Sequence, residues 1–196
     1  MSGNKKGIKA FLAKKDIVFS AKRYGIDALG AMAQGLFASL LIGTILKTLG
    51  QQAGIEVLVE IGNFAQSATG PAMAVAIGYA LKCPPLVLFS LVAVGSAANS
   101  LGGAGGPLSV LVITIFAAEF GKLVSKETKI DILVTPIVTT LVGVGAAYII
   151  APPIGSAASA FGQLIVQTTK LQPFFMGVLV SVLVGVALTL PISSVR

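Results

Sequence analysis

Residues 83–118 read CPPLVLFSLVAVGSAANSLGGAGGPLSVLVITIFAA and carry no charged side chain over thirty-six positions. A helix needs about 20 residues to cross a bilayer, so this stretch is long enough for two crossings. Its middle, residues 102–107, has four glycines in five positions, which cannot hold a continuous helix. The proline that follows suits the first turn of a new helix. The stretch therefore predicts two membrane helices joined at a glycine-rich break.

Uncharged runs also make up most of the remaining chain. Only 11% of all residues are charged, against roughly 25% in soluble domains, and a water-soluble fold could not cover so much apolar surface. The run 132–169 is again long enough for two helices and has turn-forming residues at 151–155. We therefore predict an all-α fold, a polytopic integral membrane helical bundle of about six or seven transmembrane segments with broken or re-entrant helices. The predicted segments are 28–46, 61–81, 84–98, 107–124, 132–150, 155–169 and 173–190.

Basic residues indicate how the chain is oriented. Seven of them precede the first predicted segment: Lys5, Lys6, Lys9, Lys14, Lys15, Lys22 and Arg23. Because short cytoplasmic loops are enriched in Lys and Arg, the N-terminus is expected in the cytoplasm. Residues 1–27 would then form a basic cytoplasmic or interfacial region, and residues 28–196 a transmembrane permease-like domain. Residues 8–19 favour a helix lying on anionic lipid, with a solvated basic tail as the alternative. The net charge of +7 is explained without a nucleic-acid partner.

Several spacings recur along the chain. Asp27 and Asp131 each open an uncharged run, and the interval from residue 61 to Lys82 equals that from residue 149 to Lys170. These matches favour a parallel internal repeat of about four segments, cut short in its second copy. Coincidence in so apolar a sequence is the alternative. The repeat predicts that the natural protein is longer than this chain.

Several kinds of catalytic chemistry lack the residues they require. Histidine is absent, which removes the commonest proton shuttle at physiological pH, and the single Cys83 cannot form a disulfide within the chain or a multi-cysteine metal site. Pro84 and Pro85 follow Cys83 and offer no amide donors to a phosphoryl group, so a structural cysteine is favoured over a phosphorylated thiol. No nucleotide-binding motif is present. We expect no enzyme activity, cofactor or metal site in this chain, and any phosphoryl transfer would need partner subunits.

Polar groups within the apolar segments define the candidate site. Backbone amides freed at a helix break suit a hydroxyl-rich or anionic ligand, and side-chain amides within hydrocarbon need a partner. The alternatives are an external glycine-rich loop and hydrogen bonds between helices. The predicted substrate-binding residues are Asn63, Gln66, Asn99, Ser100, Gly102, Gly103, Gly105, Gly106 and Glu119.

Glu119 allows two interpretations of equal weight. A carboxylate within a membrane segment is costly unless it is paired or faces a cavity, so a functional role is the default. Lys122, however, lies one helical turn further on, and an ion pair near the cytoplasmic interface would explain both charges.

Two stretches carry a family resemblance: NSLGGAGGPL, from Asn99, and AEFGKLVSKETKIDILVTP, residues 118–136. With them the chain resembles the membrane-component IIC-like family of the sugar phosphotransferase system, which includes the regulatory protein PfoR. The likeness runs from about Phe11 to the end, and family members are generally longer. It implies a multi-pass protein of the bacterial cytoplasmic (inner) membrane that binds a sugar or related metabolite, with IIB- and IIA-type partners and pairing as a homodimer.

The chain departs from well-studied IIC components, which bind sugar with glutamate and often histidine. It has no histidine and no evident phosphoryl-carrying domain, so the resemblance supports the architecture more firmly than sugar transport. The leading hypothesis is a permease-like protein that binds and translocates a small polar solute by alternating exposure, with Glu119 as a gate or hydrogen-bond partner. The alternatives are a membrane-embedded regulator or sensor without net transport, and an ion-coupled carrier in which Glu119 titrates.

Overall fold

The computed structural model describes residues 11, 14–17, 20–168, 177 and 181, and this part of the chain is helical with no strand. The first long helix joins four segments without interruption: η1 (Arg23–Asp27), α2 (Ala28–Leu36), η2 (Phe37–Leu41) and α3 (Ile42–Ala53). The segments η1 and η2 are π-helical. The elements that follow are α4 (Glu56–Ser67), α5 (Thr69–Ala80), α6 (Pro85–Gly102), the 3₁₀ turn η3 (Gly103–Gly105), α7 (Gly106–Val124) and α8 (Asp131–Thr168).

Three described stretches are long and apolar enough to cross a membrane by length and composition. They are Arg23–Ala53, Pro85–Val124 and Asp131–Ala160. The second stretch contains α6, η3 and α7, and it folds back on itself at η3, so the predicted break at 102–107 is confirmed. The helical membrane architecture is thus as expected. The number of segments and the repeat stay predictions, since most of the segment 173–190 lies outside the described residues.

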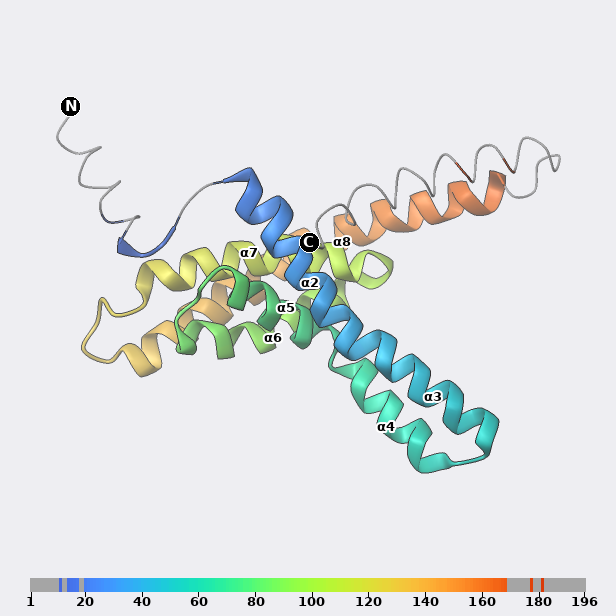
Figure 1. Cartoon of the computed structure of the whole chain (residues 1–196). Coiled ribbons are helices and arrows are strands. Elements are labelled where there is room, and N and C mark those ends of the chain that lie inside the picture. The colour runs from blue at the N-terminus through green and yellow to red at the C-terminus, as the bar shows by residue number, and fades with distance from the viewer. Residues whose placement is uncertain (1–10, 12–13, 18–19, 169–176, 178–180, 182–196) are drawn as a thin grey trace.

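The core of the molecule is a bundle in which α5, α6, α7 and the first part of α8 pack together, with α2 against α5 (Figure 1). Its fully buried residues include Met73, Ile77, Leu91, Val94 and Ile113. The helix backbones approach closely at small residues. A Cβ added at Gly95 on α6 would lie 2.4 Å from the carbonyl oxygen of Gly70 on α5. Such contacts are typical of helix packing in membranes.

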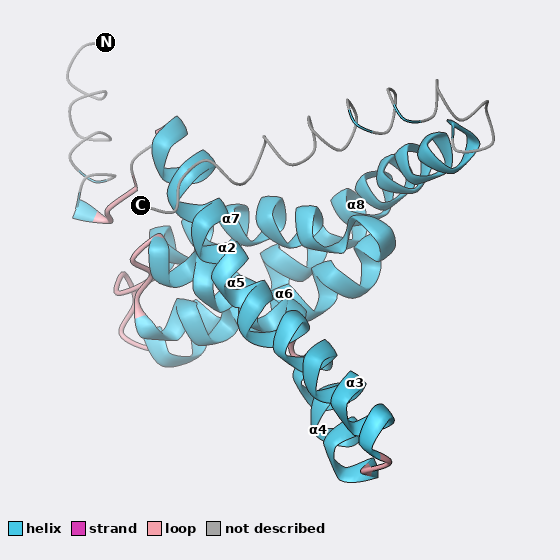
Figure 2. Ribbon diagram, turned by 45° about the vertical axis from the view of Figure 1, so that its right-hand side comes forward, coloured by secondary structure: helices cyan, strands magenta, loops and turns pink. Residues whose placement is uncertain are grey.

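A second helix pair extends away from this bundle. The helices α3 and α4 form a hairpin that projects from it (Figures 1 and 2). Gly43 and Gly62 allow the close approach, because a Cβ at Gly43 would lie 2.7 Å from the Gly62 carbonyl oxygen. Large apolar side chains on the hairpin face outward, among them Phe64, which is 75% exposed. Such a surface suits lipid or another protein surface better than water.

The predicted segment 61–81 contains the expected interruption. Ala68 separates α4 from α5, and Pro71 lies in the first turn of α5. The predicted interfacial helix at 8–19 lies mostly outside the described residues.

The break predicted at 151–155 is wrong. The helix α8 runs without interruption over Asp131–Thr168, so the predicted segments 132–150 and 155–169 form one helix.

A close tertiary contact supports α8 beside Pro152 and Pro153. A proline inside a helix removes a backbone donor and crowds a carbonyl, but hydroxyl side chains and neighbouring helices can compensate in a packed membrane helix. The Ser156 hydroxyl donates a hydrogen bond to the Pro152 carbonyl at 3.0 Å, but the carbonyls that the two prolines leave without a helical donor are those of Tyr148 and Ile149. Gly155 packs on the carbonyl of Gly102, from which an added Cβ would lie only 2.5 Å away. Packing against the glycine-rich turn therefore supports the helix where the sequence alone suggested a turn.

Candidate functional site

The turn between α6 and α7 depends on glycine at two positions. Gly103 has φ 48° and ψ −119°, a backbone conformation that residues with a Cβ avoid. Gly106 packs against Asn99, because a Cβ added at Gly106 would lie only 2.5 Å from the side-chain oxygen of Asn99. The chain therefore reverses within η3 and leaves the backbone of Gly103 and Ala104 exposed.

A hollow of about 530 Å³, open to the surface, lies between this turn and α8, and we call it the glycine-turn cavity. Its size falls within the range of roughly 300–1,000 Å³ that is usual for small-molecule sites. Its polar side chains come from one face of α8, where Ser159 and Gln163 are exposed and make no side-chain hydrogen bond within the described part of the chain. The cavity is lined by Leu101, Gly102, Gly103, Ala104, Pro152, Gly155, Ser156, Ser159, Ala160 and Gln163.

The predicted glycines divide into two groups at this turn. Gly102 and Gly103 line the cavity. Gly105 and Gly106 are buried and instead allow close packing. A Cβ at Gly105 would lie 2.9 Å from the carbonyl oxygen of Ile154 on α8. The two buried glycines therefore shape the turn without lining the cavity.

The other predicted polar groups do not line this cavity either. Asn99 is half-buried and packs against Gly70 as well as Gly106, and Ser100 is exposed. Asn63 and Gln66 lie on α4, where Asn63 is exposed. The side-chain amide of Gln66 donates a hydrogen bond to the Thr44 hydroxyl on α3 at 2.9 Å. This bond favours the interpretation of Gln66 as a contact between helices.

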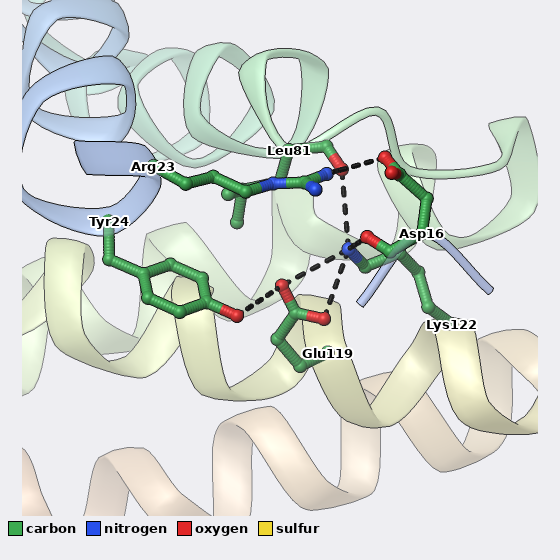
Figure 3. Close-up of polar contacts among 6 residues, drawn as sticks. All are labelled: Asp16, Arg23, Tyr24, Leu81, Glu119 and Lys122. Atoms are coloured by element: carbon green, nitrogen blue, oxygen red, sulfur yellow. Dashed lines mark hydrogen bonds and ion pairs between the residues drawn. The ribbon is translucent and has the colours of Figure 1, made fainter. Parts of the chain in front are cut away.

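Glu119 lies at the opposite end of α7 from the glycine-rich turn. It follows Gly106 by thirteen residues, which is about 20 Å along a helix axis. Its carboxylate is 3.0 Å from the Lys122 ammonium and accepts a hydrogen bond from the Tyr24 hydroxyl at 3.0 Å (Figure 3). Glu119 is 8% exposed and Lys122 2%. This geometry matches the ion-pair interpretation and separates Glu119 from the glycine-turn cavity.

The same ammonium group belongs to a wider cluster (Figure 3). Lys122 donates to the carbonyls of Asp16, at 3.2 Å, and Leu81, at 3.3 Å. Arg23 donates to the same Leu81 carbonyl at 2.7 Å and pairs with the Asp16 carboxylate at 2.6 Å. Leu81 follows the last residue of α5, where carbonyls lack partners within the helix and a positive charge is favourable. The cluster thus joins the segment before α2 to the ends of α5 and α7.

Cys83 lies in the turn after α5. Burial raises the pKa of its thiol to about 12, although the nearby Lys122 acts in the opposite direction. The group is therefore a thiol and not a nucleophilic thiolate at neutral pH. This favours the structural interpretation over a phosphorylated cysteine.

Sequence analysis missed the contribution of α8 to the cavity. Ser156, Ser159 and Gln163 follow the spacing i, i+3 and i+7, which places them on one helical face and could have marked them as a set. Nothing in the sequence, however, pairs that face with a turn about fifty residues earlier. The expected break at 151–155 also concealed the face by dividing the helix.

These features define a class of protein: a helical membrane protein with a glycine-rich helix hairpin and a solute-sized cavity beside it. The chain matches the family described as Phosphotransferase system, EIIC, over residues 26–196. It therefore belongs to this family and is a membrane component of the phosphotransferase system, as the resemblance of 118–136 and the glycine-rich stretch predicted. Comparisons with curated proteins and with solved structures gave no match.

Proposed function

We propose that this EIIC-family protein binds a small polar solute, such as a sugar, in the glycine-turn cavity and carries it across the membrane. The observation that carries the proposal is a polar lining among apolar membrane helices. Sugar hydroxyls both donate and accept hydrogen bonds, and the Ser159 hydroxyl and the Gln163 amide can do the same. At the exposed Gly103 no side chain shields the backbone, so a ligand can approach it closely.

Transport would require the cavity to open to each side of the membrane in turn. Its two walls belong to different elements, since the end of α6 and the turn η3 form one and α8 the other. A shift of α8 relative to the hairpin would change access to the solute, as in other carriers with a site at a helix break. Phosphorylation of the solute would be the task of IIB- and IIA-type partners, and we expect a homodimer in the bacterial inner membrane with the N-terminus in the cytoplasm.

Binding and flux are measured separately to test this proposal. The purified protein is titrated calorimetrically with a panel of mono- and disaccharides, and uptake of each labelled sugar is followed in proteoliposomes. We expect Ser159→Ala and Gln163→Ala each to weaken binding about three- to tenfold, as for loss of a neutral hydrogen bond. Ser96→Ala is the control, because Ser96 is exposed on α6 and does not line the cavity.

The outcomes separate the candidate functions. Equal binding by wild type and both α8 variants would place the solute elsewhere, and no binding of any sugar would reject this solute class. Binding without flux would instead identify a membrane-embedded sensor or regulator. An ion-coupled carrier would need a titrating Glu119, whose carboxylate is already held by Lys122 and Tyr24.

A further inference from the structure

A second cavity lies at the other end of the bundle from the glycine-rich turn. It has a volume of about 450 Å³ and is enclosed by the segment 14–16, the turn between α5 and α6, the end of α7 and the loop before α8. We call it the lysine pocket. Because α6 has eighteen residues, about 27 Å of helix separates this pocket from the glycine-turn cavity. Its lining residues are Lys14, Lys15, Asp16, Lys82, Pro84, Lys122, Ser125, Lys126 and Glu127.

The charges in this pocket do not balance. Both lining carboxylates are already paired, Asp16 with Arg23 at 2.6 Å and Glu127 with Lys15 at 2.5 Å. All seven carboxylate side chains of the sequence fall within the described residues, and none of them forms an ion pair with the lining residues Lys14, Lys82 or Lys126. Asp131 lies nearby but accepts hydrogen bonds from the Lys126 backbone amide and the Thr135 hydroxyl. The pocket therefore keeps an excess of positive charge that an anion would neutralise.

A buried hydroxyl in the same pocket also lacks a partner. Ser125 is 2% exposed, and within the described part of the chain its hydroxyl makes no hydrogen bond. Its backbone carbonyl, in contrast, accepts one from the Lys15 ammonium. Buried polar atoms are almost always paired, and of the three buried hydroxyls without a partner among the described residues, those of Ser109, Thr114 and Ser125, that of Ser125 belongs to a residue lining this lysine-rich pocket. A ligand with acceptor atoms would pair it. The preference for basic residues in cytoplasmic loops would explain the lysines, but it does not explain a buried hydroxyl without a partner.

The backbone around the pocket is unusual as well. Among the described residues, three that are not glycine have positive φ: Asp16 at 52°, Lys82 at 55° and Lys126 at 63°. All three line the lysine pocket. Such conformations are uncommon and tend to occur at functional sites, so their coincidence here agrees with a binding role.

We propose that the lysine pocket binds a phosphate group. A phosphate offers several acceptor oxygens and up to two negative charges, which match the unpaired ammonium groups and the free Ser125 hydroxyl. The volume exceeds that of a bare phosphate, so the group belongs to a larger molecule. Two sources share this chemistry: the headgroup of an anionic phospholipid and a water-soluble phosphate ester. Neither depends on the solute proposed for the glycine-turn cavity.

The experiment has one arm for each source. In the first arm, the detergent-purified protein, stripped of lipid, is titrated calorimetrically with inorganic phosphate and with glycerol 3-phosphate. In the second arm, the protein is placed in phosphatidylcholine nanodiscs with or without phosphatidylglycerol, and retained lipid is counted by native mass spectrometry. Binding in the first arm identifies a soluble ester, and selective retention of phosphatidylglycerol identifies a lipid headgroup.

Variants show whether the pocket itself is responsible. We expect Lys82→Gln and Lys126→Gln each to weaken binding about tenfold, since each loses a charge-assisted hydrogen bond, and Ser125→Ala to weaken it several-fold. Lys129→Gln is the matched control, because it removes the same charge from the same exposed loop outside the pocket lining. It should bind within twofold of the wild type. Lys82 and Lys126 are exposed and form no ion pair within the described residues, so their variants should elute as a single monodisperse species.

Two results would overturn the proposal. Equal losses for Lys129→Gln and Lys126→Gln would show that diffuse surface charge, and not the pocket, attracts anions. Failure of the wild-type protein to bind either phosphate probe or to retain phosphatidylglycerol would show that the pocket holds no phosphate.

Discussion

The ammonium group of Lys122 is almost fully enclosed and depends on Glu119 for its counter-charge. Removing one partner of a buried ion pair leaves an uncompensated charge and typically costs about 3–5 kcal/mol. We therefore predict that Glu119→Gln lowers the free energy of unfolding by about that amount, although glutamine can still accept a hydrogen bond from Tyr24. The measurement is thermal stability in detergent, monitored as the loss of the monodisperse elution peak.

Two further variants show whether the pair is the cause. The double variant Glu119→Gln/Lys122→Met removes both charges and should recover part of the lost stability. Glu60→Gln serves as the control, since Glu60 is exposed and forms no ion pair within the described residues. If Glu119→Gln were as stable as Glu60→Gln, the pair would contribute nothing to the fold.

The sequence indicates only part of this cluster. The spacing of Glu119 and Lys122 predicts their contact, because residues three apart on a helix are neighbours. Tyr24 and the carbonyls of Asp16 and Leu81 join the pair only through the packing of α5, α7 and the segment before α2. A single sequence carries no signal for contacts between residues so far apart.

At the scale of helices, glycines decide how closely α5 and α6 approach. A Cβ at Gly95 would lie 2.4 Å from both the Ala74 side chain and the Gly70 carbonyl, neither of which can move away without shifting a backbone. We predict that Gly95→Ala separates the two helices and destabilises the protein by about 1–3 kcal/mol, as overpacking does. Thermal stability in detergent is again the measurement.

The chain provides a matched control for this substitution. Gly145 on α8 has no atom within 4 Å of an added Cβ, so Gly145→Ala makes the same chemical change without a clash. Because alanine is the better helix former, Gly145→Ala should be neutral or more stable by up to about 1 kcal/mol. Equal destabilisation by both variants would mean that backbone approach at Gly95 is not what holds α5 against α6.

Helix length and helix breaks were predictable to different degrees. Uncharged runs predict where helices occur, because only apolar segments can lie in hydrocarbon, and the glycines of 102–107 predict the turn before α7. Pro152 and Pro153 were misleading, because the contact of Gly155 with the glycine-rich turn supports α8 beside them. This contact is tertiary, and so is the pairing of α8 with that turn that creates the cavity.

At the scale of the whole molecule, charge and polarity are divided between the two ends of one bundle. The ion-pair cluster and the lysine pocket lie where α5 and α7 end, and the glycine-turn cavity lies where α6 ends. The segment 14–17 closes the charged end through Asp16 and Lys15, which pair with Arg23 and Glu127. The attachment of this segment is therefore partly electrostatic and should depend on pH.

The direction of this dependence follows from the pKa values of the two carboxyl groups. The hydrogen bond from Arg23 lowers the pKa of Asp16 below its usual 3.8, and that from Lys15 lowers the pKa of Glu127 below its usual 4.5. A group whose pKa falls on folding stabilises the folded form above its usual pKa, and this contribution is lost as pH falls through the lowered value. We predict that the segment stays attached from neutral pH to about 5 and is released progressively below about 4.

Hydrogen exchange of residues 14–27, corrected for the intrinsic effect of pH, measures this release in nanodiscs between pH 3 and 7. The wild type should be protected above pH 5 and lose protection below about 4. The double variant Asp16→Asn/Glu127→Gln has no carboxylate at either position and should be less protected at neutral pH, without the acid-dependent loss. Asp27→Asn is the control, because Asp27 is exposed and forms no ion pair within the described residues, so its profile should follow the wild type. An unchanged acid-dependent loss of protection in the double variant would show that other groups hold this segment on the bundle.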